Sequence, residues 1–281
     1  MRIATWNVNS LKARLPRVEE WLAQRAPDVL LMQETKLADQ AAPDMPFQMA
    51  GYELAHHGEG RWNGVAIASR VGIADVITNF GDGPVRRSPG PESATAAIAT
   101  AIEAEASVAP GDEARMISAV CGSVRVVSIY APNGRALDTP FYRAKLAWFD
   151  RLARWLRETQ DPAGSLVIGG DFNVAPEDID VYDPRDFAGA THVSGPERKA
   201  VAALRDWGLV DAYRLHHPEP GKFSWWDYRA GNFHKGLGMR IDHLYVTRSV
   251  AARCTAADID RDARKGQLPS DHAPVYIDLR D

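Results

Sequence analysis

The chain has 281 residues, 45% of them hydrophobic, and a formal net charge of −4. This length and apolar content suffice for one large core, and the slight acidity excludes a protein that coats nucleic acid through a broadly basic surface. The two cysteines, Cys121 and Cys254, lie far apart in the chain. Neither a disulfide framework nor a cysteine-based zinc site is therefore predicted.

No apolar run approaches the roughly 18 residues that a membrane span requires. Residues 1–11 are too short and too polar to be a secretory signal. We therefore expect a cytoplasmic protein with no membrane partner. We also expect it to be a monomer.

Strands are predicted where short apolar runs are rich in Val, Ile and aromatic residues and end at Gly, Pro, Asn or Asp. In chain order these runs are residues 2–6, 28–33, 64–69, 125–130, 165–170, 239–246 and 273–279.

Helices are predicted where apolar residues recur at spacings of three and four. The segments are residues 15–27, 139–159 and 196–208. Pro16 suits a first helical turn and Pro27 a stop, Thr139 is expected to cap the second helix before Pro140, and Gly208 ends the third. The periodic face of the second helix consists of Phe141, Lys145, Trp148, Leu152, Trp155 and Leu156.

Several predicted strands are separated by too little chain for a helical crossover, so the sheets should be mixed or largely antiparallel, in a layered α/β sandwich. No GxGxxG or GxxxxGK[ST] motif is present, which removes the common nucleotide-binding folds. We expect one catalytic domain over residues 1–281. Residues 81–114 are rich in Gly, Pro, Ala, Ser and Glu and predict a surface insertion, with a weak helix at about residues 93–106.

Polar residues follow the predicted strands, one after another. A single such residue indicates a turn, but the whole set predicts a polar site if the strand ends meet at one edge. Its members are Asn7, Glu34, Tyr130, Asn133, Asp171, Asn173, Asp242, Asp271 and His272.

Carboxylates and amides without cysteine are hard oxygen ligands, which suit Mg²⁺, with Mn²⁺ as a substitute, better than zinc. Glu34 is the expected principal ligand, with Asn7 and Asp271 near it. A histidine beside a carboxylate is kept protonated and can contact a phosphate; Asp242 or Asp271 could orient His272 in this way.

Asp171 and Asn173 are two residues apart, so they project together and could activate and hold a water molecule. Tyr130 offers a hydroxyl to developing negative charge. The residues therefore predict metal-assisted hydrolysis of a phosphate ester.

Eight motifs in this order resemble exodeoxyribonuclease III, the bacterial apurinic/apyrimidinic endonuclease family of the endonuclease/exonuclease/phosphatase superfamily. They are WNVNSL, DVLLMQETK, IYAPNG, GGDFNVAP, GLVDAYR, FSWWDYR, GMRIDHLY and PSDHAP. The resemblance covers nearly the whole chain outside residues 81–114. It implies a four-layer α/β sandwich whose two packed mixed, largely antiparallel sheets are flanked by helices, with the active site at one edge.

The resemblance also implies roles for individual residues. Glu34 would be the principal metal ligand, helped by Asn7 and Asp271. Asp171 would activate or align the water with Asn173 beside it, and His272, oriented by Asp242, would contact the scissile phosphate.

Tyr130 and Asn133 would contact phosphate as well. In the stretch KFSWWDYRAGNFHKGLGMRID, Trp225 and Met239 resemble the apolar walls around an extrahelical abasic sugar, and Arg229 and Lys235 would meet DNA phosphates. Arg135 is a further expected DNA contact. The other histidines, His192 among them, match no catalytic motif and are expected to pack on the surface or within loops.

The function implied is a Mg²⁺-dependent DNA-repair nuclease that acts on double-stranded DNA. It would cleave the phosphodiester 5′ to abasic sites, with 3′–5′ exonuclease and 3′-end-cleaning activity. Two alternatives remain: a superfamily phosphatase or phosphodiesterase acting on a phosphate ester other than DNA, and a non-catalytic DNA-binding module.

Overall fold

The computed structural model describes residues 1–81 and 113–280, and the predicted insertion with its weak helix lies almost wholly outside them. The first sheet has the strand order β11 (Cys254–Ile259), β12 (Val275–Leu279), β1 (Arg2–Asn7), β2 (Val29–Gln33), β4 (Val65–Ser69), β3 (Glu53–His57). The second has the order β5 (Ala74–Thr78), β6 (Met116–Cys121), β7 (Val124–Tyr130), β8 (Leu166–Asp171), β10 (Asp242–Thr247), β9 (Leu209–Asp211).

Within the described strands, β1–β2 and β7–β8 pair in parallel and all other neighbours are antiparallel. The α-helices are α1 (Leu11–Arg25), α2 (Asp44–Met49), α4 (Pro140–Thr159), α5 (Gly195–Trp207), α6 (Asn232–Lys235) and α7 (Arg248–Ala251). Short 3₁₀ turns occur at η1 (Asp39–Ala41), η4 (Asp178–Asp180), η5 (Pro184–Phe187), η6 (Arg229–Gly231) and η7 (Arg261–Arg264).

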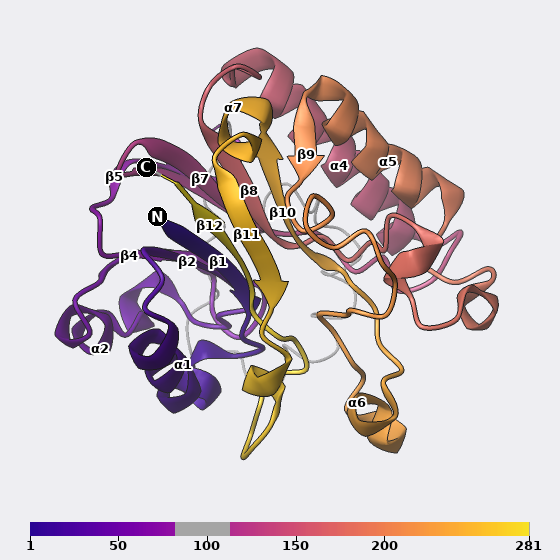
Figure 1. The fold of residues 1–281 in the computed structure, drawn as a ribbon, viewed down its shortest axis with the longest axis horizontal. Helices are drawn as coiled ribbons and strands as arrows, with labels where there is room; N and C mark the ends of the chain where they lie inside the picture. Colours follow the sequence, from indigo (N-terminus) through magenta and orange to yellow (C-terminus); the bar gives the residue numbers. More distant parts are fainter. Residues whose placement is uncertain (82–112, 281) are drawn as a thin grey trace, which may run out of the picture.

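The elements form four layers, with α1 and α2 outside the first sheet and α4 and α5 outside the second (Figure 1). One apolar core lies between the sheets, a second between the first sheet and α1, and a third between the second sheet, α4 and α5. The predicted four-layer α/β sandwich with mixed, largely antiparallel sheets is confirmed.

Gly169 on β8 lies at a point of close approach between the two sheets. A Cβ atom there would stand 2.7 Å from Leu31 of the first sheet and 2.7 Å from Leu244 of the second. Because real side chains do not tolerate such distances, glycine lets these layers meet.

The strand directions explain why the polar residues gather. Asn7, Tyr130 and Asp171 end β1, β7 and β8, and Glu34 directly follows β2. Asp242 begins β10, which runs antiparallel to β8, so the residue opposite it is Asp171. Strand ends and antiparallel strand starts therefore lie at one edge.

The predicted helices at 139–159 and 196–208 are confirmed as α4 and α5. Thr139 caps α4 by accepting a hydrogen bond from Tyr142 N at 3.2 Å, and Gly208 follows the last residue of α5. The expected start of the first helix at Pro16 is wrong, because α1 begins at Leu11, whose side chain is fully buried in the core under that helix. Pro16 therefore lies inside α1, with its ring on the exposed side.

None of the helices within residues 1–81 and 113–280 has the length and apolar character required to cross a membrane.

We predict that Pro16→Ala raises the free energy of unfolding by about 1 to 3 kcal/mol, because it restores an N–H inside the helix and removes the clash of the ring with the preceding turn. Pro140→Ala is the matched control, since Pro140 occupies the first position of α4, where no N–H partner is lost. Urea unfolding of both variants measures the difference. Equal effects would show that Pro16 imposes no strain on α1.

Candidate active site

Asn7 connects the two principal carboxylates of the site. Its Nδ2 donates to Glu34 Oε1 at 2.9 Å and to Asp171 Oδ2 at 2.9 Å. Asn7 and Asp171 are buried, and the Glu34 side chain is 17% exposed. Glu34 also has a positive φ of 52°, an uncommon conformation that directs its carboxylate away from the path of β2.

A metal ion fits this group. Atoms of Glu34, Asp171 and His272 lie within 4.8 Å of one another, and the two carboxylates are the groups that would hold a cation, because a protonated histidine ring cannot ligate a metal. The side-chain N–H groups of Asn7 face these carboxylates, and Lys36 Nζ lies 2.8 Å from Glu34 Oε2. These donors balance the negative charge that a bound cation would also balance. Rotation of the Asn7 amide would present its oxygen instead, which completes a set of hard oxygen donors suited to Mg²⁺ or Mn²⁺.

His272 is held between two carboxylates. Its Nδ1 lies 2.8 Å from Asp242 Oδ2, and its Nε2 lies 3.8 Å from Asp171 Oδ2. Ser224 Oγ donates to the same Asp242 oxygen at 2.6 Å and fixes the carboxylate. Asp242 therefore orients His272, and Arg240, two residues earlier, pairs with Asp180 and Asp211 instead.

This arrangement shifts two pKa values. Burial alone lowers the pKa of His272, but the charges of Asp242 and Asp171 outweigh it and raise the pKa to about 10. Burial raises the pKa of Asp171 to about 7, His272 opposes this shift, and the charges of Asp242 and Glu34 add to it. The ring is thus an imidazolium at neutral pH, while Asp171 takes up and releases a proton near pH 7.

Tyr130, at the end of β7, lies opposite Asp171 in the parallel ladder and makes a side-chain hydrogen bond with Glu34. Burial and, after it, the charge of Glu34 raise the pKa of its phenol well above the usual range. Tyr130 is therefore a neutral hydroxyl donor at the carboxylate group.

Asn173 and Asn133 form a second polar group beside Asp171. Asn173 N donates to Asp171 Oδ1 at 2.9 Å, and Asn173 Oδ1 accepts from Asn133 Nδ2 at 3.2 Å. His192 joins them, with its Nε2 3.1 Å from Asn173 Oδ1 and 3.2 Å from Asn133 Nδ2. His192 lies in a loop, as expected, and its ring also contacts the two asparagine side chains.

His192 is neutral at pH 7, because burial, with the charge of Lys145 adding to it, lowers its pKa to about 3. No sequence motif marks it. Its position depends on how residues 188–195 fold back toward Asn133, which lies 59 residues earlier.

Asp271 lies beside the carboxylate group but has other partners. Its Oδ1 accepts from Asn9 Nδ2 at 2.9 Å and its Oδ2 from Trp225 Nε1 at 3.0 Å. Within the described residues it is outside the set whose ligand atoms cluster. Its predicted role as a metal ligand stays a prediction.

The residues predicted to form the walls of the sugar pocket lie together. Trp225 and Met239 exchange backbone hydrogen bonds at 2.9 and 3.0 Å, and Trp225 also forms a β-bridge with His272. Trp225 is partly buried, whereas Met239 is only 4% exposed, in an apolar cluster with Val181 and Ile241.

The predicted basic DNA contacts are exposed, and Arg135 is joined to the site through its backbone, because its N–H donates to Asn133 Oδ1 at 3.0 Å. Arg135, next to Asn133, has its guanidinium 3.8 Å from the centre of the Phe141 ring. Arg229 pairs with Asp227 at 2.5 Å, and Lys235 ends α6, which projects beyond the sheets (Figure 1). Their DNA contacts stay predictions.

Lys36, Asn9 and Ser224 are site residues that were not singled out from the sequence. Lys36 Nζ also donates to Asn9 Oδ1 at 2.6 Å, which joins the Glu34 loop to the loop after β1. Lys36 belongs to the motif QETK and Ser224 to FSWWDYR, so the motifs themselves contained the signal.

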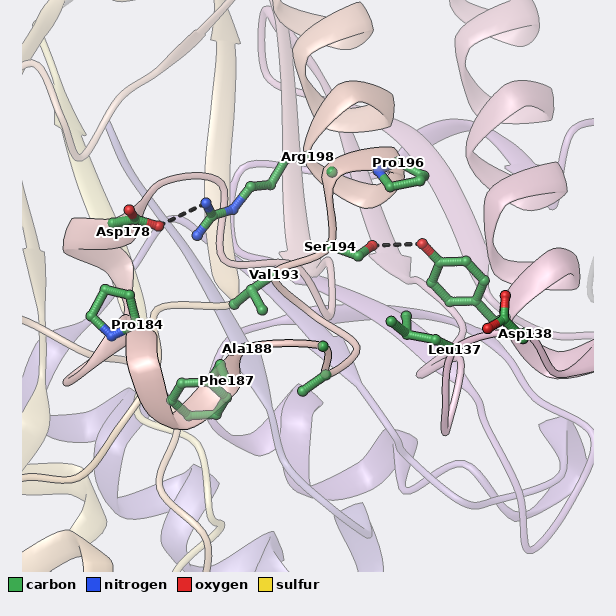
Figure 2. Close-up of a pocket in the computed structure, with 14 residues that line it drawn as sticks. Leu137, Asp138, Asp178, Pro184, Phe187, Ala188, Val193, Ser194, Pro196 and Arg198 are labelled. Atoms are coloured by element: carbon green, nitrogen blue, oxygen red, sulfur yellow. Dashed lines mark hydrogen bonds and ion pairs between the residues drawn. The ribbon is translucent and has the colours of Figure 1, made fainter.

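A cavity of about 520 Å³ lies next to the segment that carries His192, between the loop before α4 and the start of α5 (Figure 2). Four of its polar side chains form two pairs: Arg198 with Asp178 at 2.7 Å, and Tyr142 with Ser194 at 2.6 Å. The carboxylates of the candidate active site do not line it.

Comparison with known proteins connects this geometry to a family. The model of the endonuclease/exonuclease/phosphatase family matches residues 4–272. The chain belongs to that family. Exodeoxyribonuclease III of Haemophilus influenzae is 30% identical over 289 residues, which cover 100% of both chains.

Two solved structures of the family resemble the chain closely. An AP endonuclease from Archaeoglobus fulgidus has a TM-score of 0.88 and 34% identity, with 99% of each chain covered. The 3′ phosphatase NExo from Neisseria, bound to product DNA hairpin, has a TM-score of 0.86 and 37% identity, with 100% of this chain and 99% of the other covered. The predicted family and its class of enzyme, a DNA-repair nuclease, are confirmed.

We predict that Glu34→Ala weakens Mg²⁺ binding without unfolding the protein. An ion that binds only the folded state stabilises it, by about 2.7 kcal/mol at a hundred times the dissociation constant. Mg²⁺ should therefore raise the melting temperature of the wild type more than that of the variant. Glu53→Ala, which removes an exposed carboxylate on β3, is the control. An equal shift in wild type and Glu34→Ala would remove Glu34 from the metal site.

We predict two opposite effects of Asp171→Asn. The turnover number should fall by about 10² to 10⁴, the usual contribution of a general base, with little change in DNA binding. In the metal-free folded protein the pKa of Asp171 is about 7, whereas its ordinary value is 3.8. The folded state therefore binds this proton more tightly than the unfolded state does, and the free energy of unfolding falls as the pH rises from 3.8 to about 7.

The variant should therefore melt at a higher temperature than the wild type at pH 8 in EDTA, and this advantage should shrink toward pH 5. Single-turnover cleavage and melting curves at both pH values measure the two effects. A lower melting temperature at pH 8 with near-normal chemistry would make Asp171 an ordinary turn residue.

Proposed function

We propose that this protein is a Mg²⁺-dependent nuclease, with Mn²⁺ as a substitute, that hydrolyses the phosphodiester 5′ to abasic sites in duplex DNA. It would also remove nucleotides and blocking groups from 3′ ends. The observation that carries the proposal is the meeting of Glu34, Asn7 and Asp171 with the His272–Asp242 pair at one edge of two sheets.

In this proposal, each residue acts through the group that it presents. Asp171 accepts a proton from the attacking water, and Asn173, whose N–H donates to Asp171 Oδ1, holds that water through its amide. His272, as an imidazolium, donates to a phosphate oxygen, and Tyr130 donates its hydroxyl to the charge that develops. A divalent ion held by Glu34 and Asn7, with Asp271 near it, would polarise the phosphate and stabilise the leaving oxygen.

DNA would lie across this edge. Asn133 and Arg135 would contact phosphates on one side, with Trp225 and Met239 as the apolar wall and Arg229 and Lys235 at the rim. Trp62, 55% exposed, adds an aromatic surface on the loop that hydrogen-bonds to Thr35 and Lys36.

One observation favours 3′-end processing as the main activity. Met239 is only 4% exposed, which leaves little open surface for an extrahelical sugar. The similarity to the 3′ phosphatase NExo, 37% identical, supports the same activity.

The test uses one purified protein and three duplexes, one with an internal abasic analogue, one with a 3′ phosphate and one with an unmodified recessed 3′ end. With Mg²⁺ we expect incision 5′ to the analogue, removal of the 3′ phosphate and shortening of the recessed end, all abolished by EDTA. Asp171→Asn prepared in parallel excludes a contaminating nuclease.

The pattern of products separates the candidate functions. Processing of 3′ ends without incision would make the second activity the main one. Hydrolysis of an aryl phosphodiester with no cleavage of any duplex would indicate a non-DNA esterase. Tight duplex binding with no hydrolysis of any substrate would indicate a binding module.

A further inference from the structure

A buried ion pair lies directly behind the amide side of the active site. Lys145 of α4 and Glu197 of α5 both have side-chain exposures of 0%, and Lys145 Nζ is hydrogen-bonded to Glu197 Oε1. Lys145 Nζ also donates to the backbone carbonyls of Asn173 at 2.7 Å and Asn133 at 3.2 Å. The three N–H groups of the ammonium are thus used, two of them on residues of the site.

Glu197 holds the segment on the other side of the pair. Its Oε1 accepts from Thr191 Oγ1 at 2.7 Å and from His192 N at 3.0 Å. Its Oε2 accepts from Ser194 N at 3.1 Å and Ser194 Oγ at 2.6 Å. Burial by itself raises the pKa of Glu197, but Lys145 and these donors hold it below the usual range, so the pair is ionic.

The pair therefore ties together three loops that are remote in sequence. They follow β7, follow β8 and precede α5, and they carry Asn133, Asn173 and His192, whose side chains meet each other. Among the hydrogen bonds of the described residues, Lys145 Nζ is the one donor atom that bonds to the backbones of both Asn133 and Asn173.

The backbone around the pair is strained. Asn173, Arg135 and His192 have positive φ angles of 52°, 55° and 79°. Non-glycine residues hold such angles only where the surrounding contacts enforce them. Gly134 has a φ of 84°, and a Cβ atom there would lie 2.9 Å from Lys145 Cδ, so glycine leaves the space through which the lysine reaches the loops.

Stability alone does not account for this pair. A buried ion pair is often no more stabilising than apolar residues of the same volume, whereas loss of one partner leaves a costly unpaired charge. An apolar pair could not form the hydrogen bonds by which Lys145 and Glu197 hold two backbone carbonyl groups and two backbone N–H groups in fixed directions.

We infer that Lys145 and Glu197 are positioning residues, which hold the amides of Asn133 and Asn173 and the ring of His192 in register with the scissile phosphate. This inference rests on the proposed roles of Asn133 and Asn173 in the hydrolysis of DNA. The pair touches neither Glu34 nor His272, so it acts on the chemical step and leaves metal binding intact.

The test compares Glu197→Gln with the double variant Lys145→Met/Glu197→Leu, which replaces the pair by apolar side chains. We expect single-turnover cleavage to fall by about tenfold to a hundredfold in both, the size of effect produced by a misplacement of about 1 Å. The Mg²⁺ dissociation constant should stay within twofold of the wild type. The double variant keeps the test valid if an unpaired charge prevents folding of the single one.

Asp260→Asn is the matched control, because Asp260 is also buried and paired, with Arg25 at 2.8 Å and Trp21 Nε1 at 3.0 Å. It should lower the melting temperature and leave cleavage by the folded protein unchanged. A folded double variant that cleaves at the wild-type rate would overturn the inference.

Nuclear magnetic resonance of the side-chain amides of Asn133 and Asn173 gives a readout independent of activity. Both signals should shift or broaden in the pair variants and not in Asp260→Asn. If the wild type cleaves no DNA, the proposed function fails while this readout still tests positioning. Unchanged amide signals in the pair variants would overturn the inference alone.

Discussion

The hydrogen bonds of Asn7 join the two sheets at the edge where the residues of the candidate active site meet. Asn7 ends β1 of the first sheet, Glu34 follows β2 of that sheet, and Asp171 ends β8 of the second, so one amide links residues from both sheets. Gly169, two residues before Asp171, lets the two sheets pack closely. The packing there also controls the distance between Asn7 and Asp171. Substitutions that separate the layers there would therefore act on the site as well as on the core.

The electrostatics of the site follow from this convergence. Glu34, Asp171 and Asp242 are brought together with one imidazolium, and burial magnifies both their repulsion and their attraction. Repulsion among these carboxylates destabilises the metal-free protein. A bound cation would relieve this repulsion, which favours strong binding. Function and local stability thus oppose each other at this edge.

The sequence predicted the centre of the fold better than its periphery. Each predicted strand is found, but β11, β3, β5 and β9, the four edge strands, were missed together with β6. Edge strands are shorter or more polar than central ones, as ELAHH of β3 illustrates, and they lack the apolar run that identifies a buried strand.

Within the candidate site, too, some residues could be predicted from the sequence and others could not. Residues at or just after the ends of central strands, such as Asp171 and Glu34, could be predicted to meet because strand direction alone gathers them. His192 was not, since its place depends on loop paths that no periodicity encodes. Lys145 was noticeable in the sequence because it is a charged residue within the apolar face of α4. The structure explains this position, because the lysine side chain is buried.

The first and last strands are neighbours. β1 pairs with β12, and Met1 and Leu279 hydrogen-bond to each other through their backbones, so the chain ends lie side by side (Figure 1). β1 also pairs with β2, and His272 precedes β12. During synthesis, β1 therefore keeps an open edge until β12 has been made. Such long-range pairing slows folding, and it delays assembly of the candidate active site until β12 is in place.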